Sequence, residues 1–133
     1  MEIKDQLLQK ANEAKNNAYA PYSNYKVGAA ILSKSGNIYS SCNVENISFP
    51  CGTCAEAGAI AAMIAGGDSK ISAILVVADA KELVYPCGAC LQRIAEFSDD
   101  ETTIYLADAK KVCKTYNMKE LLPQNFIAAE LKR

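Results

Sequence analysis

Three cysteines and one glutamate are spaced so that they could form a zinc site that activates water. Cys54-Ala55-Glu56 places a thiol two residues from a carboxylate, and Pro86-Cys87-Gly88-Ala89-Cys90 follows about thirty residues later. Catalytic zinc typically has three protein ligands and an open fourth position, and an acid beside the metal can move protons. This combination predicts hydrolytic chemistry, provided that the rest of the chain positions the four side chains.

The same cysteines also fit a closed structural zinc site. Cys51-Gly52-Thr53-Cys54 and Cys87-Gly88-Ala89-Cys90 are two CxxC pairs, which together are the usual signature of structural zinc. A single CxxC pair beside a helix can instead be redox-active. Spacing alone supports the closed and the open zinc site about equally.

The expected helix positions favour the open site. Cys87 and Cys90 flank the start of one predicted helix, and Cys54 starts another. Unpaired N–H groups and the positive end of the helix dipole favour thiolates at such positions. Cys51 lies a turn earlier, in a loop with Pro and Gly, and we interpret it as a small hydrophobic residue.

Glu56 also has a purely structural interpretation. Thr53-Cys54-Ala55-Glu56 fits a capping box, in which Thr53 is the N-cap and Glu56 bonds back to its amide, and the pattern alone slightly favours this role. The neighbouring thiol supports the catalytic role, because a carboxylate two residues from a ligand can contact water on the metal. Cys42 and Cys113, in predicted strands, are interpreted as core residues.

Composition and charge narrow the class of protein. The chain has 133 residues, half of them apolar, and a net charge of −1. This composition predicts one globular domain over residues 1–133 with no nucleic-acid partner. The N-terminus has no apolar run, and the apolar stretch 71–80 is too short to span a membrane. We therefore expect a cytoplasmic protein with reduced thiols. It contains no histidine, so Ser-His-Asp chemistry is excluded.

Hydrophobic periodicity predicts alternating helices and strands, and hence a mixed sheet with helices on both faces. Gly28-Ala29-Ala30 leaves room for the close approach of another element. The helix over 54–65 is apolar nearly all round, which predicts burial on more than one side. The expected helices are 3–18, ending before Pro21, then 54–65, 87–97 and a turn at 118–122. The pattern also allows a helical tail at 126–131. The expected strands are 27–32, 38–44, 71–78, 102–107 and 111–116.

The motif at 54–56 and 86–90 resembles the signature of the zinc-dependent cytidine deaminases, in the small form with three cysteine ligands. The resemblance covers nearly the whole chain and implies a three-layer α/β/α fold around a mixed five-stranded sheet. Further blocks occur in the order and spacing of that family. They are Ala20-Pro21-Tyr22-Ser23, Val27-Gly28-Ala29-Ala30, Asn43-Val44-Glu45-Asn46 and Glu120-Leu121-Leu122-Pro123.

The resemblance implies a role for each residue of the motif. Cys54, Cys87 and Cys90 would bind one Zn²⁺ per subunit, which lowers the pKa of a water molecule. Glu56 would take a proton from that water, deliver one to N3 of the pyrimidine, and later protonate the amino group that leaves C4 as ammonia. The backbone N–H of Ala55 would hold the carbonyl oxygen of the base.

The resemblance also implies residues that bind the nucleoside. Asn43 and Glu45 match a pair that hydrogen-bonds the ribose hydroxyls, although without the family match a plain strand-end turn would explain them. Tyr25 stands near the substrate, where the family usually has Phe. Phe126 matches an aromatic residue that reaches into a neighbouring subunit's site, so a homotetramer is implied.

Two departures from the family concern charge. The family usually has Arg after the catalytic Glu and after the last cysteine, where this chain has Ala57 and Leu91. The only arginines in the chain are Arg93 and Arg133. Because three thiolates on Zn²⁺ leave a formal charge of −1, we expect helix dipoles and polar neighbours such as Gln92 to offset more of it.

These observations predict deamination of cytidine and 2′-deoxycytidine in pyrimidine salvage. The nearest alternative is a related aminohydrolase acting on another cytosine-containing compound, such as blasticidin S. A non-catalytic binding domain, with all four CxxC cysteines closed on zinc, is an alternative from a different class. The net charge of −1 argues against a deaminase that edits nucleic acid.

Overall fold

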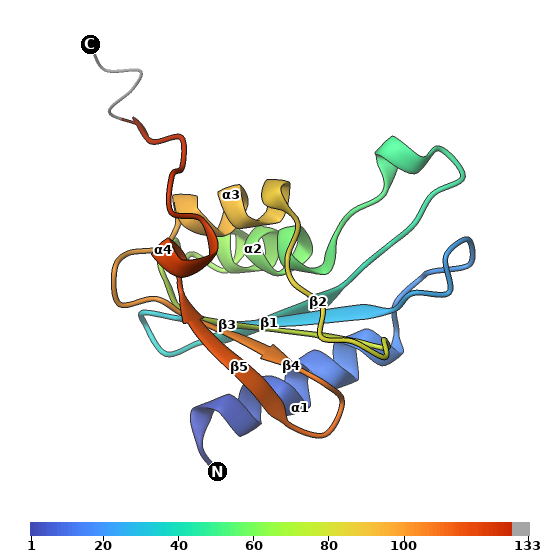
Figure 1. Ribbon diagram of the computed structural model, residues 1–133, viewed down its shortest axis with the longest axis horizontal. Coiled ribbons are helices and arrows are strands. Elements are labelled where there is room, and N and C mark those ends of the chain that lie inside the picture. Colours follow the sequence, from blue (N-terminus) through green and yellow to red (C-terminus); the bar gives the residue numbers. More distant parts are fainter. Residues whose placement is uncertain (129–133) are drawn as a thin grey trace.

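A five-stranded mixed sheet lies at the centre of the computed structural model, which describes residues 1–128 (Figure 1). The helices are α1 (Ile3–Asn16), the 3-10 turn η1 (Phe49–Cys51), α2 (Ala55–Ala65), α3 (Gly88–Glu96) and α4 (Met118–Leu121). The strands are β1 (Val27–Ser33), β2 (Ile38–Cys42), β3 (Ile71–Ala78), β4 (Thr103–Ala107) and β5 (Val112–Asn117).

Strand β3 occupies the middle of the sheet. The strand order is β2-β1-β3-β4-β5, in which β3 and β4 are parallel and the other neighbours are antiparallel. All but one of the residues of β3 are buried. This confirms the prediction from its continuous apolar run, because a strand covered on both faces needs apolar side chains on both.

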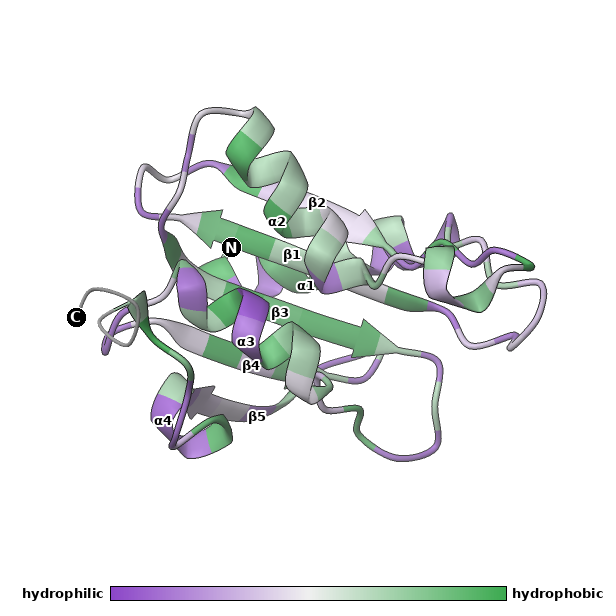
Figure 2. Ribbon diagram, turned by 90° about the horizontal axis from the view of Figure 1, so that it is seen from above, coloured by the Kyte–Doolittle hydropathy of each residue, from purple (hydrophilic) through white to green (hydrophobic). Residues whose placement is uncertain are grey.

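Helices cover both faces of the sheet. Helix α1 lies on one face, and α2, α3 and α4 lie on the other (Figure 1). Helices α2 and α3 run side by side, and their N-terminal ends point to the end of the sheet at which β3 finishes (Figure 2). The predicted three-layer α/β/α architecture is therefore confirmed, and it brings the two cysteine-bearing helix starts to one end of the molecule.

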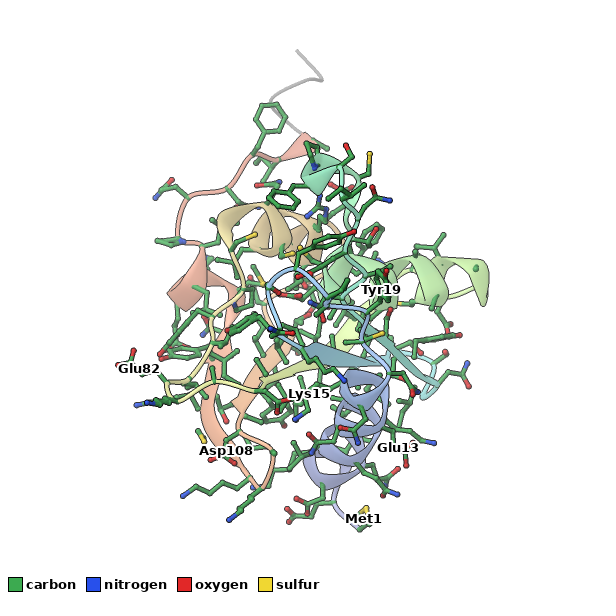
Figure 3. All side chains as sticks on the ribbon, turned by 90° about the vertical axis from the view of Figure 1, so that its right-hand side faces the viewer. Met1, Glu13, Lys15, Tyr19, Glu82 and Asp108 are labelled. Carbon is green, nitrogen blue, oxygen red and sulfur yellow. The ribbon has the colours of Figure 1, made fainter. Side chains whose placement is uncertain are left out.

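Two apolar clusters hold the layers together, one on each face of the sheet. The cluster under α2 and α3 includes Ile31, Met63, Ile74, Ile94 and Leu106. The cluster under α1 includes Leu7, Leu8, Ala11, Leu75 and Val77. Lys15 of α1 (Figure 3) is only 4% exposed, and its ammonium group pairs with Asp79 just after β3. Its buried charge is therefore compensated.

Several predicted details differ in the structure. Strand β2 ends at Cys42 rather than at residue 44, because Val44 instead forms isolated bridges with Tyr19 and Thr53. The interpretation of Cys113 as a core residue was wrong: β5 is an edge strand, and Cys113 is exposed. The expected tail at 126–131 lies partly outside the described residues.

Helix α2 is buried on one side only within this chain. Its sheet-facing side is buried, whereas Ala61 is exposed and Ile64 is 45% exposed on the outer side. The expected burial on more than one side is therefore not found within a single chain.

No helix in the part of the chain that the structure describes is long and apolar enough to cross a membrane.

Gly28 lies where α1 crosses β1 at close range. A Cβ atom at this position would lie 2.0 Å from the carbonyl oxygen of Ala11 and 2.9 Å from Cβ of Lys15, so the predicted close approach is confirmed. Gly28→Ala is expected to lower the free energy of unfolding by about 1–3 kcal/mol or more, because the neighbouring backbone cannot move aside locally. Urea unfolding of the metal-free protein measures this change. Gly88→Ala is the matched control, since no atom beyond its chain neighbours and its own helix backbone lies within 4 Å of the point that its added methyl group would occupy. Equal losses of stability in both variants would contradict the steric argument.

Candidate active site

The candidate zinc ligands lie at the starts of two neighbouring helices. Cys54 is the N-cap of α2, and Cys87 is the N-cap of α3. Cys90 follows in the first turn of α3 and is 1% exposed. The first N–H groups of a helix have no partner within it, so both starts present donors and positive dipole ends to the thiols. The predicted placement of the three cysteines at helix starts is confirmed.

The capping-box interpretation of Glu56 was wrong. Helix α2 begins at Ala55, and its N-cap is Cys54, with no side-chain capping hydrogen bond. Thr53 precedes the cap because its backbone N–H and carbonyl both pair with Val44. A capping box does occur in this structure, but at α4, between Asn117 and Glu120.

The Cys90 thiol lies among negative groups. Burial raises its pKa, and the nearby Glu56, Cys54 and Cys87 raise it further, with a hydrogen bond to Cys54 contributing. In residues 1–128, however, no group of three His, Cys, Asp or Glu side chains is arranged so that it could hold a metal ion as it stands. The donor chemistry of the three cysteines nevertheless fits Zn²⁺, which thiolates bind strongly.

Glu56 is a buried acid beside these thiols. Its side chain lies in the first turn of α2 and the residue is only 5% exposed. Burial raises the pKa of its carboxyl, while its own amide, a hydrogen bond from Cys90 and the positive charge of Arg93 partly lower it. A carboxyl with a raised pKa beside a reaction site is suited to accepting and returning protons near neutral pH.

Arg93 contacts the thiol cluster, which the sequence analysis did not predict. Its Nη1 atom donates a hydrogen bond to Sγ of Cys90 over 3.6 Å. The available signal was the spacing, because residues three apart on a helix lie on the same face. Gln92, which we expected to help offset the thiolate charge, instead donates to the carbonyl oxygen of Phe126 over 2.9 Å.

Tyr25 and Ala55 lie near the buried acid. Ala55, the first residue of α2, is fully buried, and Tyr25 is 37% exposed. Burial raises the pKa of the Tyr25 hydroxyl, and the charge of Glu56 raises it further. Tyr25 and Glu56 therefore face the same region, although they come from segments thirty-one positions apart (56 − 25).

The predicted sugar-binding pair is anchored to the loop before β1. Oδ1 of Asn43 accepts from the backbone N–H of Val27, and its Nδ2 donates to the carbonyl oxygen of Tyr25, both over 2.8 Å. Glu45 accepts from the backbone N–H groups of Tyr22 and Ser23 and from the Ser23 hydroxyl. The Ser23 hydroxyl is the main cause of the lowered pKa of Glu45. Glu45 is thus held as a carboxylate.

A cavity of about 360 Å³ lies beside Glu45. Its lining residues are Tyr22, Ser23, Glu45, Asn46, Phe49 and Gly52. The thiols and Glu56 are not among them, so this hollow does not contain the reacting groups. It has space for part of a small ligand near the predicted sugar-binding carboxylate.

Cys51 and Phe126 lie apart from the thiol cluster. Cys51 is exposed in η1, where its Sγ donates to the hydroxyl of Ser48 over 3.5 Å. Phe126 is 60% exposed, in the segment after α4 that is tied to α3 through Gln92. Within this chain, the structure therefore brings neither residue to the buried acid.

The chain is similar to known deaminases over nearly its whole length. Residues 1–107 match the family described as the cytidine and deoxycytidylate deaminase zinc-binding region. A cytidine deaminase of Sporosarcina psychrophila is 38% identical over 127 residues, which are 96% of this chain and 93% of that protein. A cytidine deaminase of Halalkalibacterium halodurans is 39% identical over 125 residues, 94% of this chain and 95% of that protein.

A solved structure gives the same result for the fold. The crystal structure of cytidine deaminase from Burkholderia pseudomallei superposes with a TM-score of 0.87 and 35% identity, covering 95% of this chain and 100% of that chain. The family match spans the two helix starts that carry Cys54, Cys87 and Cys90. The chain therefore belongs to the cytidine and deoxycytidylate deaminase family and carries its zinc-binding region.

Proposed function

We propose that this protein is a zinc-dependent hydrolase that deaminates cytidine and 2′-deoxycytidine to the uridine products, with release of ammonia, in pyrimidine salvage. The observation that carries the proposal is the buried Glu56 carboxyl beside Cys90, at the meeting point of two helix N-termini. Metal-assisted hydrolysis needs ligands that hold the metal and an acid or base beside it that moves protons. The thiols and the buried carboxyl supply these groups. Residues 1–133 form the single catalytic domain in this proposal.

Cys54, Cys87 and Cys90 would hold one zinc ion per chain. Their position at two helix starts supports this assignment, because the dipole ends stabilise thiolates. All six cysteines are free thiols, which suits a cytoplasmic protein. When bound, the metal supplies Lewis-acid activation of a water molecule. Cys51 remains outside this set, because its thiol bonds to Ser48 in a separate turn.

Glu56 would move the protons of the reaction. Its carboxylate takes a proton from the attacking water and passes it to N3 of the pyrimidine, which makes C4 more electrophilic. The remaining hydroxide adds to C4. Glu56 then takes the proton of the new C4 hydroxyl and passes it to the amino group, so that ammonia leaves as the C4 carbonyl forms. The N–H of Ala55, at the first position of α2, has no acceptor within the helix and would hold the carbonyl oxygen of the base.

Asn43, Glu45 and Tyr25 would bind the nucleoside. The Glu45 carboxylate is fixed by three donors and lines a cavity of about 360 Å³. The amide of Asn43 is likewise fixed by the backbone at Tyr25 and Val27. Fixed acceptors select ligand hydroxyls at low entropic cost, so a free sugar is favoured over a bulkier cytosine derivative such as blasticidin S.

A homotetramer would cover the exposed apolar surface and complete the sites. Segment 43–54 extends beyond the sheet and helices (Figure 1), and within it Ile47 is 75% exposed and Phe49 is 74% exposed. Ile64 on the outer side of α2 and Phe126 are also exposed. Large apolar residues gathered outside the core mark association surfaces. In this proposal, Phe126 reaches into the site of a neighbouring subunit.

A substrate panel tests the proposed function. The purified protein is expected to have the mass of a tetramer in solution, contain one zinc per chain and release ammonia from cytidine and deoxycytidine. The turnover of free cytosine should be far slower, because it lacks the hydroxyls that Glu45 would bind. Ammonia release from blasticidin S alone would favour the alternative aminohydrolase. Zinc binding with no turnover of any compound would favour the non-catalytic domain.

A further inference from the structure

The proposed zinc site carries an unbalanced negative charge. Three thiolates on Zn²⁺ leave a formal charge of −1, and the carboxylate of Glu56 adds a second negative charge beside them. Glu56 and Cys90 are both nearly inaccessible to water, so solvent screens their charges weakly. A cation that contacts Cys90 would therefore offset the negative charge of these two buried groups.

Arg93 is placed to be this cation. It is the only arginine among residues 1–128, and its Nη1 donates to Sγ of Cys90 over 3.6 Å. The three-residue spacing on α3 puts the two side chains on one face of the helix. None of the ion pairs within the described residues involves Arg93. The guanidinium of Arg93 is therefore not paired with a carboxylate within the described residues.

A groove between α2 and α3 has space for the guanidinium of Arg93. This groove is lined by Ala57, Ile60 and Ala61 from α2 and by Gln92, Arg93, Glu96 and Phe97 from α3. Ala57 directly follows Glu56 and carries only a methyl group. The small side chain keeps the groove open next to the buried acid, and Arg93 enters it from the facing helix.

We propose that Arg93 is a positioning residue of the metal site, whose guanidinium hydrogen-bonds the Cys90 thiolate and offsets the negative charge of the cysteine cluster. Arginine suits this task because it is always protonated and less strongly hydrated than lysine. Hydrogen bonds between ionised groups are stronger than neutral ones. Partners that bond to metal ligands in this way change metal affinity and the properties of the bound metal. This inference rests on the proposed three-cysteine site.

Zinc affinity of the intact protein tests the inference. Arg93→Ala is expected to weaken zinc binding by about 10- to 100-fold in competition with a chelator, as loss of a partner to a metal ligand does. Arg93→Lys should weaken it less, because the charge is kept. In the double variant Ala57→Arg/Arg93→Ala, the new guanidinium comes from α2 on the other side of the groove and should restore part of the zinc affinity. Lys119→Ala on α4 is the matched control for removing one exposed cation and should bind zinc normally.

Cobalt(II) substitution supplies a readout that a purely structural role would not move. Loss of the hydrogen bond raises the energy of the filled sulfur orbitals, so the thiolate-to-cobalt charge-transfer band of Arg93→Ala should shift to longer wavelength. An unchanged band with unchanged zinc affinity would overturn the proposal. Equal losses in Arg93→Ala, Arg93→Lys and the double variant would also overturn it, because restored charge would then have no effect. A wild-type protein that binds no zinc would instead refute the proposed function itself.

Discussion

Glu56→Gln is expected to abolish cytidine deamination while the protein keeps its zinc and its fold. The amide occupies the same volume as the carboxyl but cannot accept and return a proton. Proton transfer by a positioned side chain contributes about 10²–10⁴-fold to a rate, and Glu56 would serve at more than one step. A loss of at least about 10³-fold in kcat is therefore expected, measured as ammonia release at saturating cytidine.

Glu96→Gln is the matched control for this experiment. Glu96 is an exposed residue at the end of α3, away from the helix starts, so its replacement should leave turnover within about two-fold, as is usual for exposed positions. Zinc content measured on the same samples separates loss of chemistry from loss of metal. Normal turnover in Glu56→Gln would refute the proposed proton transfer.

The same variant should alter the pH dependence of stability in the metal-free protein. Burial raises the pKa of Glu56 above its value in the unfolded chain. Its contribution to stability is therefore fully present below the unfolded pKa, about 4.3, and is lost as the pH rises through the folded pKa. Glu56→Gln removes this dependence. The variant should accordingly have a higher melting temperature than the wild type at pH 7, and the difference between the two melting temperatures should shrink as the pH falls towards 4.

The layers of the fold were predictable because burial on both faces leaves a clear signal. The apolar run of β3, which only Ser72 interrupts, predicted the central strand. The glycine at position 28 predicted the close approach of another element, which the structure shows to be α1. The burial of residues in the edge strands of the sheet was less predictable. Cys113 looks like a core residue from its type, but it lies on an outer strand whose exposure depends on tertiary contacts.

The candidate site was predictable where function depends on backbone position. Cys54 and Cys87 lie at helix starts, which follow from local sequence signals. Thr53 was misplaced by one residue, because its pairing with Val44 delays the helix. The contact between Arg93 and Cys90 was not predictable in detail, since it depends on a side-chain conformation and on the small residues of the facing helix.

Cys90→Ser should remove zinc from the protein, whereas Cys51→Ser should not. Cys90 is buried between Cys54, Cys87 and Glu56, so its thiolate is the central donor of the proposed set. Loss of a ligand should cost more than loss of an outer partner, so zinc affinity should fall by more than about 100-fold, and turnover should fall with it.

Cys51→Ser is the matched control because it makes the same chemical change at an exposed thiol. Its Sγ already bonds to Ser48 in η1, and a serine hydroxyl can make the same contact. Metal content by atomic absorption, measured alongside ammonia release, distinguishes the two arrangements of ligands. An open site with three cysteines keeps its zinc and its activity in Cys51→Ser. If Cys51→Ser instead loses zinc as completely as Cys90→Ser, all four CxxC cysteines close on the metal, no position is left for water, and the hydrolytic mechanism fails.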